Sequence, residues 1–291
     1  MYNVDNIGKV RSILDGLKKK DVYAGDVDGF SSDKKAIERI FETTQKRTKE
    51  DILLRLTVID SMYSTQMIRR YYALQELAEK LYYLEQKKAL PDLFNEFISS
   101  KRDIHLFDGT IDGKKFNLFA ENYGIGKDGS DKGVAVSLIS KYAYFETGYG
   151  FPIYDSIASE MYPKIWSYCG FGKKTYQLMI KDTDQRIVGD KTIISYTQAI
   201  DDLINRLGGN ISYDHLDRLL WFVGKIIRGN LSLVLDREGY EWCVEHCFEK
   251  DAKGNKVVFD ITTAHIEDAP FFKENASLRA MFDLAKDIKK Q

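Results

Sequence analysis

Residues 133–155 constrain the fold more than any other stretch, with the sequence GVAVSLISKYAYFETGYGFPIYD. Small residues lead into an amphipathic helix over about 134–146, a glycine-rich turn follows, and Pro152 stands shortly before Asp155. A second helix is expected over about 156–167. Asp155 therefore falls at a helix start, where a carboxylate can cap the helix or perform chemistry.

Helical periodicity dominates the remaining sequence, and only four prolines interrupt it. Two short segments favour strands: FDGTIDGKK as a hairpin and 256–263 as a single strand. Thr48 and Asp51 have the spacing of a capping box. Further helices are expected at about 6–20, from Ser31 or Ser32 to Lys46, and at 51–62, 66–87, 91–99, 192–207, 213–228, 233–248 and 270–288. The predicted fold class is mainly α, with at most a small β hairpin or strand pair.

Composition excludes several classes of protein. The formal net charge of −1 gives no overall attraction to nucleic acid or to anionic membranes, so any such surface must be a local patch. No apolar run approaches the ~20 residues of a membrane span, and the N-terminus lacks the apolar core of a signal peptide. With an odd number of cysteines, a cytoplasmic protein without a membrane partner is predicted.

No metal or other cofactor is expected. Cys243, His246 and Cys247 are close together in the sequence. A structural zinc site requires four ligands, however, and the sequence has no second cysteine pair. On a helix, Cys243 and Cys247 share one face, which is typical of core packing. The cysteine spacing of an iron–sulfur cluster is missing as well.

The central region resembles the helix-hairpin-helix DNA glycosylase superfamily, particularly diverged bacterial proteins with an 8-oxoguanine-glycosylase-like fold. The resemblance rests on Tyr123-Gly124-Ile125-Gly126, on Ala135 to Phe145 and on Phe151 to Ser156, with weaker support from Leu53 to Gln66. It implies a glycine hairpin that holds a DNA phosphate, and a catalytic aspartate at Asp155. The lysine that forms a Schiff base in bifunctional members falls at Val136 here, and Lys141 lies closer to the aspartate.

These residues define a candidate site for monofunctional base excision. A fixed carboxylate stabilises the positive charge that develops on the sugar and can orient the attacking water. The flipped base would enter a pocket lined by aromatic side chains. Asp155 is the candidate catalytic residue, and the candidate DNA- or base-binding residues are Tyr63, Ser64, Gln66, Arg69, Gly124, Gly126, Lys141 and Tyr154. Lys141 is interpreted as a solvated helix residue or a phosphate contact.

The leading hypothesis is a monofunctional DNA glycosylase-like enzyme that acts in repair or in defence against modified invading DNA. DNA is the expected partner. The alternative is a catalytically silent nucleic-acid-binding or protein-interaction module of the same fold. The expected organisation is an N-terminal helical extension at 1–49, a glycosylase-like core at 50–168 and a C-terminal helical region at 169–291.

Overall fold

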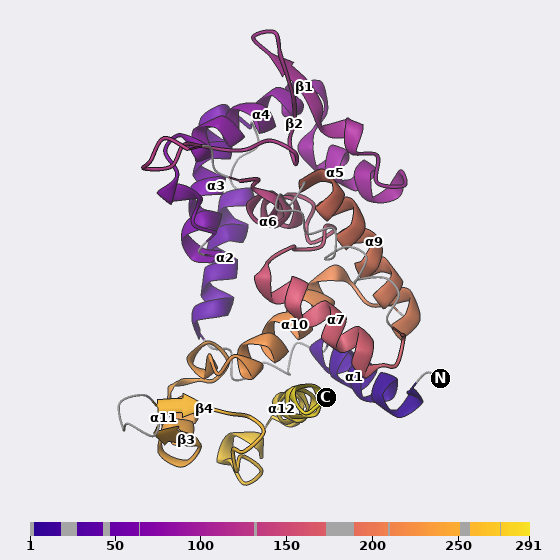
Figure 1. The fold of residues 1–291 in the computed structure, drawn as a ribbon, viewed down its shortest axis with the longest axis vertical. Coiled ribbons are helices and arrows are strands. Elements are labelled where there is room, and N and C mark those ends of the chain that lie inside the picture. The colour runs from indigo at the N-terminus through magenta and orange to yellow at the C-terminus, as the bar shows by residue number, and fades with distance from the viewer. Residues whose placement is uncertain are drawn as a thin grey trace.

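The fold is mainly helical, as predicted (Figure 1). The computed structural model describes residues 3–18, 28–42, 47–63, 65–130, 133–172, 189–208, 210–250, 257–273 and 275–291. The helices are α1 (Val4–Lys18), α2 (Asp28–Glu42), α3 (Lys49–Tyr63), α4 (Ala73–Lys87), α5 (Leu90–Ser99), α6 (Val136–Glu146), α7 (Ser156–Tyr168), α9 (Gly189–Leu207), α10 (Tyr213–Ile227), α11 (Arg237–His246) and α12 (Ala276–Lys289). Short 3-10 turns occupy Met67–Arg69, Ile104–Phe107, Leu231–Leu233 and Pro270–Phe272.

Two small antiparallel strand pairs complete the secondary structure of the described residues. The pair β1 (Asp108–Ile111) and β2 (Lys114–Asn117) confirms the hairpin predicted for FDGTIDGKK. The second pair joins β3 (Phe248–Lys250) to β4 (Val257–Phe259), so the expected strand at 256–263 is shorter than predicted. The fold thus has one strand pair more than the sequence analysis allowed.

The buried apolar side chains form two clusters, which Figure 1 displays as an upper and a lower lobe. The upper lobe contains α2 to α6 and the hairpin, while α1, α7, α10 and α12 build the lower one. The chain passes between them at 153–157, and the Tyr154 side chain packs against both. Asp155 therefore lies where the chain passes from the upper lobe to the lower one.

Helix starts follow local capping chemistry. The Thr48 hydroxyl accepts the Asp51 amide at 3.1 Å, and the Asp51 carboxylate accepts the Thr48 amide at 3.0 Å. These two bonds confirm the predicted capping box. The prediction that Ser31 or Ser32 caps the preceding helix is wrong, because α2 already begins at Asp28.

Candidate functional site

Asp155 caps α7. Its backbone is extended, and its carboxylate atom Oδ1 accepts the amides of Ile157 at 2.9 Å and Ala158 at 2.8 Å. These bonds satisfy two amides that lack partners inside the helix. The second carboxylate oxygen, Oδ2, is left to face α6.

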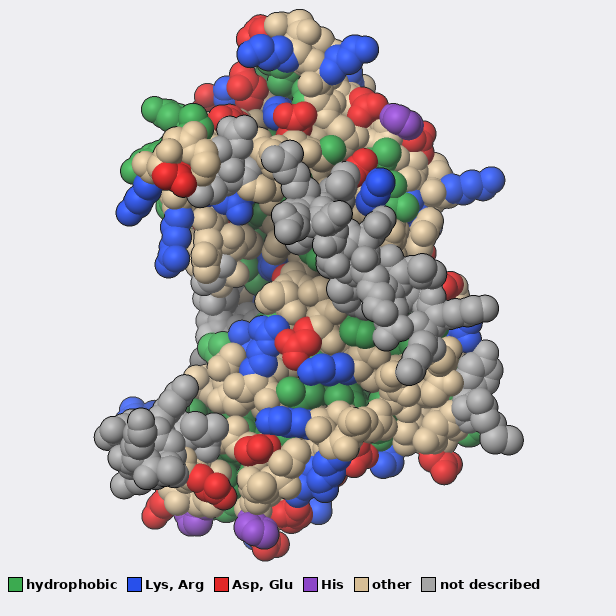
Figure 2. Space-filling model, in the orientation of Figure 1, with side chains coloured by type: hydrophobic (Ala, Val, Ile, Leu, Met, Phe, Trp, Pro, Cys, Tyr) green, Lys and Arg blue, Asp and Glu red, His purple; other side chains and the backbone are tan. Residues whose placement is uncertain are grey.

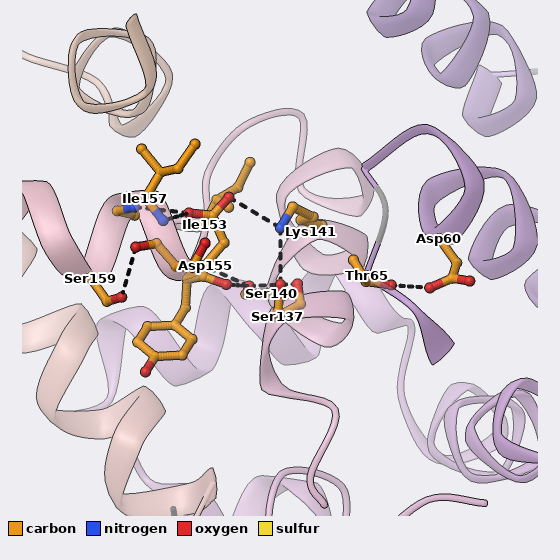
Figure 3. A network of polar contacts seen from close by, with 12 residues as sticks. Asp60, Thr65, Ser137, Ser140, Lys141, Ile153, Asp155, Ile157 and Ser159 are labelled. Carbon is orange, nitrogen blue, oxygen red and sulfur yellow. Dashed lines mark hydrogen bonds and ion pairs between the residues drawn. The ribbon is translucent and has the colours of Figure 1, made fainter. Parts of the chain in front are cut away.

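Lys141 reaches this second oxygen from the middle of α6. Its Nζ lies 3.3 Å from Asp155 Oδ2 and 2.9 Å from Ser137 Oγ, and Figure 3 shows the side chain pointing toward Asp155. The same Nζ lies 5.5 Å from the centre of the Tyr63 ring. Lys141 is only 2% exposed, so the prediction that it occupies a solvated helix face is wrong. Its amine is likewise withdrawn from any outer face where DNA phosphates would bind.

The charge of Asp155 follows from these contacts. Burial by itself raises the pKa of a carboxyl group. At Asp155 the Lys141 ammonium and the amides of Ala158 and Ile157 outweigh burial, and they hold the pKa below its ordinary value. Asp155 is therefore an ionised carboxylate at neutral pH, held in one orientation at the lobe boundary.

The segment before Asp155 is fixed by its backbone. The Ser140 hydroxyl of α6 accepts the Tyr154 amide at 3.0 Å, and the Tyr196 hydroxyl of α9 donates to the Ile153 carbonyl at 2.7 Å. The Tyr154 ring meets the Tyr196 ring edge-on at 5.1 Å between centroids. Tyr154 is half-buried beside Asp155, and its side chain packs against both lobes.

A second group of charged side chains lies in the same boundary region, and sequence reasoning missed it. The Asp214 carboxylate of α10 accepts the Lys34 ammonium at 2.8 Å and the Tyr144 hydroxyl at 2.5 Å, and it pairs with Arg218 at 3.2 Å. Lys34 also lies 4.0 Å from the centre of the Tyr149 ring. This group joins α2, α6 and α10, whose sequences are too far apart for any motif to link them.

Asp217 stands three positions after Asp214 on α10 and is half-buried. Burial raises the pKa of Asp217 to about 8, and the nearby charge of Asp155 adds to this rise while Lys141 opposes it. Asp217 is thus largely protonated at neutral pH, whereas Asp155 is ionised. The surroundings of the two carboxyl groups thus shift their pKa values in opposite directions.

The predicted helix from Gln66 to Lys87 is wrong over its first turns, because α4 begins only at Ala73. The buried Asp60 carboxylate accepts the amides of Met67 at 2.8 Å and Ile68 at 2.9 Å, together with the Thr65 hydroxyl. These bonds fold 65–72 into a compact loop. The predicted site residue Ser64 lies outside the described residues.

Left-handed backbone at Gln66 and Tyr72, with φ of 63° and 64°, turns this loop sharply. Such a conformation is uncommon for residues other than glycine, and it indicates that the backbone of this loop is constrained. Gln66 and Arg69, both predicted to bind DNA, are exposed on this loop.

The glycine hairpin serves packing rather than phosphate binding. The Gly124 amide donates to Glu76 Oε2 at 2.9 Å, and the Gly126 amide donates to the Ser130 carbonyl at 2.9 Å. Because both amides are taken, the prediction that Gly124 and Gly126 grip a DNA phosphate is wrong. Gly124 has φ of 74°, and a Cβ there would lie 2.6 Å from Ala73 Cβ, so glycine lets the hairpin pack closely.

The loop and the hairpin together present what we call the aromatic rim. The rim consists of Ile68, Tyr71, Tyr72 and Ile125, which are 66%, 56%, 67% and 40% exposed. Tyr71 and Ile125 exchange backbone hydrogen bonds in an antiparallel bridge, each at 3.0 Å. Arg69 and Lys127 are exposed on the same two segments. In Figure 2, apolar side chains project at the left of the upper lobe, with Lys and Arg side chains beneath them.

Among the described residues, no group of three or more His, Cys, Asp or Glu side chains could hold a metal ion. Cys243 is fully buried within the lower apolar cluster, as expected for a packing residue. Within the same portions of the chain, no helix is both long and apolar enough to cross a membrane. Comparisons with protein-family models, curated proteins and solved structures found no match to this chain.

Proposed function

We propose that the protein hydrolyses the N-glycosidic bond of a flipped, damaged or modified base in DNA, in repair or in defence against modified invading DNA. One observation carries this proposal. An ionised carboxylate, Asp155, is held by two helix amides beside the buried Lys141 ammonium, at the boundary between two lobes. A fixed, ionised carboxylate is a group that glycosidic cleavage uses.

Asp155 would act on the sugar. As the bond to the base breaks, positive charge develops on the deoxyribose, and a carboxylate that cannot turn away stabilises it. The same carboxylate accepts a proton from the attacking water. Lys141 keeps Asp155 ionised through their 3.3 Å contact, and its amine is already engaged with Asp155 and Ser137. The product would be an abasic site in an unbroken strand.

The aromatic rim supports DNA as the partner. Exposed apolar area of this kind on a rigid loop marks an interaction surface, and aromatic rings stack well on bases. The exposed cations Arg69 and Lys127 lie on the same segments and suit a phosphate backbone. A local patch of this type is compatible with a net charge of −1.

A silent nucleic-acid-binding module is the second candidate. It is favoured by the observation that both oxygens of Asp155 already have partners, two amides and one ammonium. Alkali treatment of duplexes carrying damaged or hypermodified bases separates the two candidates after incubation with the protein. Alkali-dependent strand breaks support excision, and salt-sensitive binding without breaks supports the module.

Replacing Tyr72 with glycine should weaken DNA binding about tenfold or more, because one stacking ring is lost. Stability should hold or rise by up to about 1 kcal/mol, since glycine adopts the positive φ of this position without strain. Fluorescence anisotropy with a labelled duplex measures the first effect and thermal unfolding the second. Leu233→Ala is the matched control, an exposed apolar residue of the lower lobe at 44% exposure. If both variants weaken DNA binding equally, the aromatic rim is not the DNA-binding surface.

A further inference from the structure

Ser137 and Asp155 are held by the same ammonium group. Lys141 Nζ donates to Ser137 Oγ at 2.9 Å and to Asp155 Oδ2 at 3.3 Å, and Figure 3 shows the three side chains together. Because two N–H bonds of one ammonium diverge by a tetrahedral angle, the two oxygens lie roughly 5 Å apart. One water molecule can span such a gap, since each of its hydrogen bonds covers about 2.8 Å.

The Ser137 hydroxyl uses only its acceptor side in this contact. Its oxygen accepts the Lys141 ammonium, so its own O–H points elsewhere. Ser140, one turn further along α6, donates its hydroxyl to the Ser137 carbonyl at 3.0 Å, as helical serines often do. Within the described ranges of the chain, the Ser137 O–H has no hydrogen-bond acceptor. A polar donor in a half-buried position is more stable with a partner, so this O–H is available for an additional one.

Both oxygens belong to side chains that solvent can reach, whereas the lysine between them does not. The Asp155 side chain is 22% exposed and the Lys141 side chain only 3%. Ser137 is half-buried in the first turn of α6. Lys141 therefore approaches the two oxygens from the protein interior, and water can reach them without displacing the buried ammonium.

The spacing of the two oxygens is fixed by the fold. Ser137 lies on α6 and Asp155 caps α7, so each side chain starts from a helix end. The Ser140 hydroxyl of α6 accepts the Tyr154 amide at 3.0 Å, which ties the residue before Asp155 to the same helix. Together with the Lys141 contacts, this bond holds the two oxygens in one arrangement. Such prior positioning of a reactant lowers the entropic cost of reaching the transition state.

We propose that Ser137 and Asp155 hold the attacking water between them, which makes Ser137 a second catalytic residue of the site. The inference rests on the proposed function. The Ser137 O–H donates to the water oxygen, and the water donates one of its O–H bonds to Asp155 Oδ2. A lone pair of the water oxygen is then left to attack the sugar carbon.

The reaction step balances with these two residues. The glycosidic electron pair leaves with the base as the water oxygen bonds to the sugar carbon. The water proton passes to the Asp155 carboxylate, and the departing base takes up a proton from solvent. Asp155 then returns its proton to solvent. The products are the free base and an abasic sugar, and Ser137 is unchanged because it acts as a hydrogen-bond donor and not as a nucleophile.

Removing the hydroxyl should slow base release by the full-length protein from duplexes carrying hypoxanthine, 8-oxoguanine or 5-hydroxymethylcytosine. Ser137→Ala keeps α6 intact, because alanine is the best helix former, and should slow release about tenfold or more. Ser137→Thr retains a hydroxyl and should stay within about threefold of wild type. Ser159→Ala is the matched control, since the half-buried Ser159 hydroxyl donates to the Ser156 carbonyl at 3.3 Å, and it should keep the wild-type rate.

The product distinguishes a serine that binds water from one that only supports the helix. In water containing methanol, either molecule can attack the sugar, which gives an abasic sugar or its methyl glycoside. Wild type should select water, and Ser137→Ala should raise the share of methyl glycoside about threefold or more, because one anchor of the water is lost. An unchanged share in Ser137→Ala overturns the inference even if its rate falls. No base release by wild type from any of the duplexes overturns the proposed function as well.

Discussion

Asparagine at position 155 is expected to reduce base release by at least about 10³-fold. The amide retains the cap on α7, because its oxygen can accept the amides of Ile157 and Ala158. It carries no charge, so it cannot stabilise the sugar cation or accept the proton of water. Strand breaks revealed by alkali give the measurement, and wild-type rates in Asp155→Asn would contradict the assignment.

The same substitution should also cost stability, about 1–3 kcal/mol in the free energy of unfolding. Lys141 is buried, and without Asp155 it keeps no dedicated counter-ion. The double variant Asp155→Asn/Lys141→Met removes the buried ammonium and should recover stability but not activity. That pair of results separates chemistry from folding.

Replacing Arg55 with methionine should destabilise the upper lobe by about 3 kcal/mol. Arg55 and the Glu146 carboxylate are each 1% exposed and pair at 2.9 Å, while the guanidinium lies 4.5 Å from the centre of the Phe41 ring. Burial raises the pKa of Glu146, and Arg47 and Arg55 oppose that rise. Losing Arg55 therefore removes one of the two arginines that neutralise the buried Glu146 carboxylate, and Arg47 is left to do so.

The loss of stability in Arg55→Met should depend on pH. Without Arg55 the pKa of Glu146 rises further above its unfolded value, so its stability contribution persists at low pH and is lost as pH rises. Urea unfolding should show a large defect at pH 7 and a small one near pH 4. Arg237→Met is the matched control, because the Arg237–Glu241 pair is 89% and 61% exposed and contributes little. Similar defects in both variants would contradict the account of the buried pair.

Local sequence signals predicted much of the fold because they act over a few residues. The amphipathic pattern at 213–228 gave α10, Pro91 marked the start of α5, and Pro-x-x-Asp marked the cap at Asp155. The loop at 65–72 escaped prediction because its turn depends on Asp60. A helical pattern of side chains cannot reveal that the backbone amides of Met67 and Ile68 donate to a buried carboxylate.

The candidate site was only half predictable for the same reason. Asp155 had a local signature, but Lys141 was assigned to solvent because its spacing from Asp155 differs from that of the resembled superfamily. Asp214 is brought to Lys34 by lobe packing across 180 positions of the chain. Asp217 carries no motif, and the rise of its pKa follows from burial and from the charges assembled around it.

Release of free base under single-turnover conditions tests the central claim most directly. Wild type and Asp155→Asn/Lys141→Met, once shown to be equally stable, are incubated with duplexes carrying neutral damaged or hypermodified bases, and mass spectrometry quantifies the released base. The account predicts release by wild type, an intact strand with an abasic site, and no release by the double variant. Absence of release by wild type from every duplex, or equal release by both proteins, would contradict it.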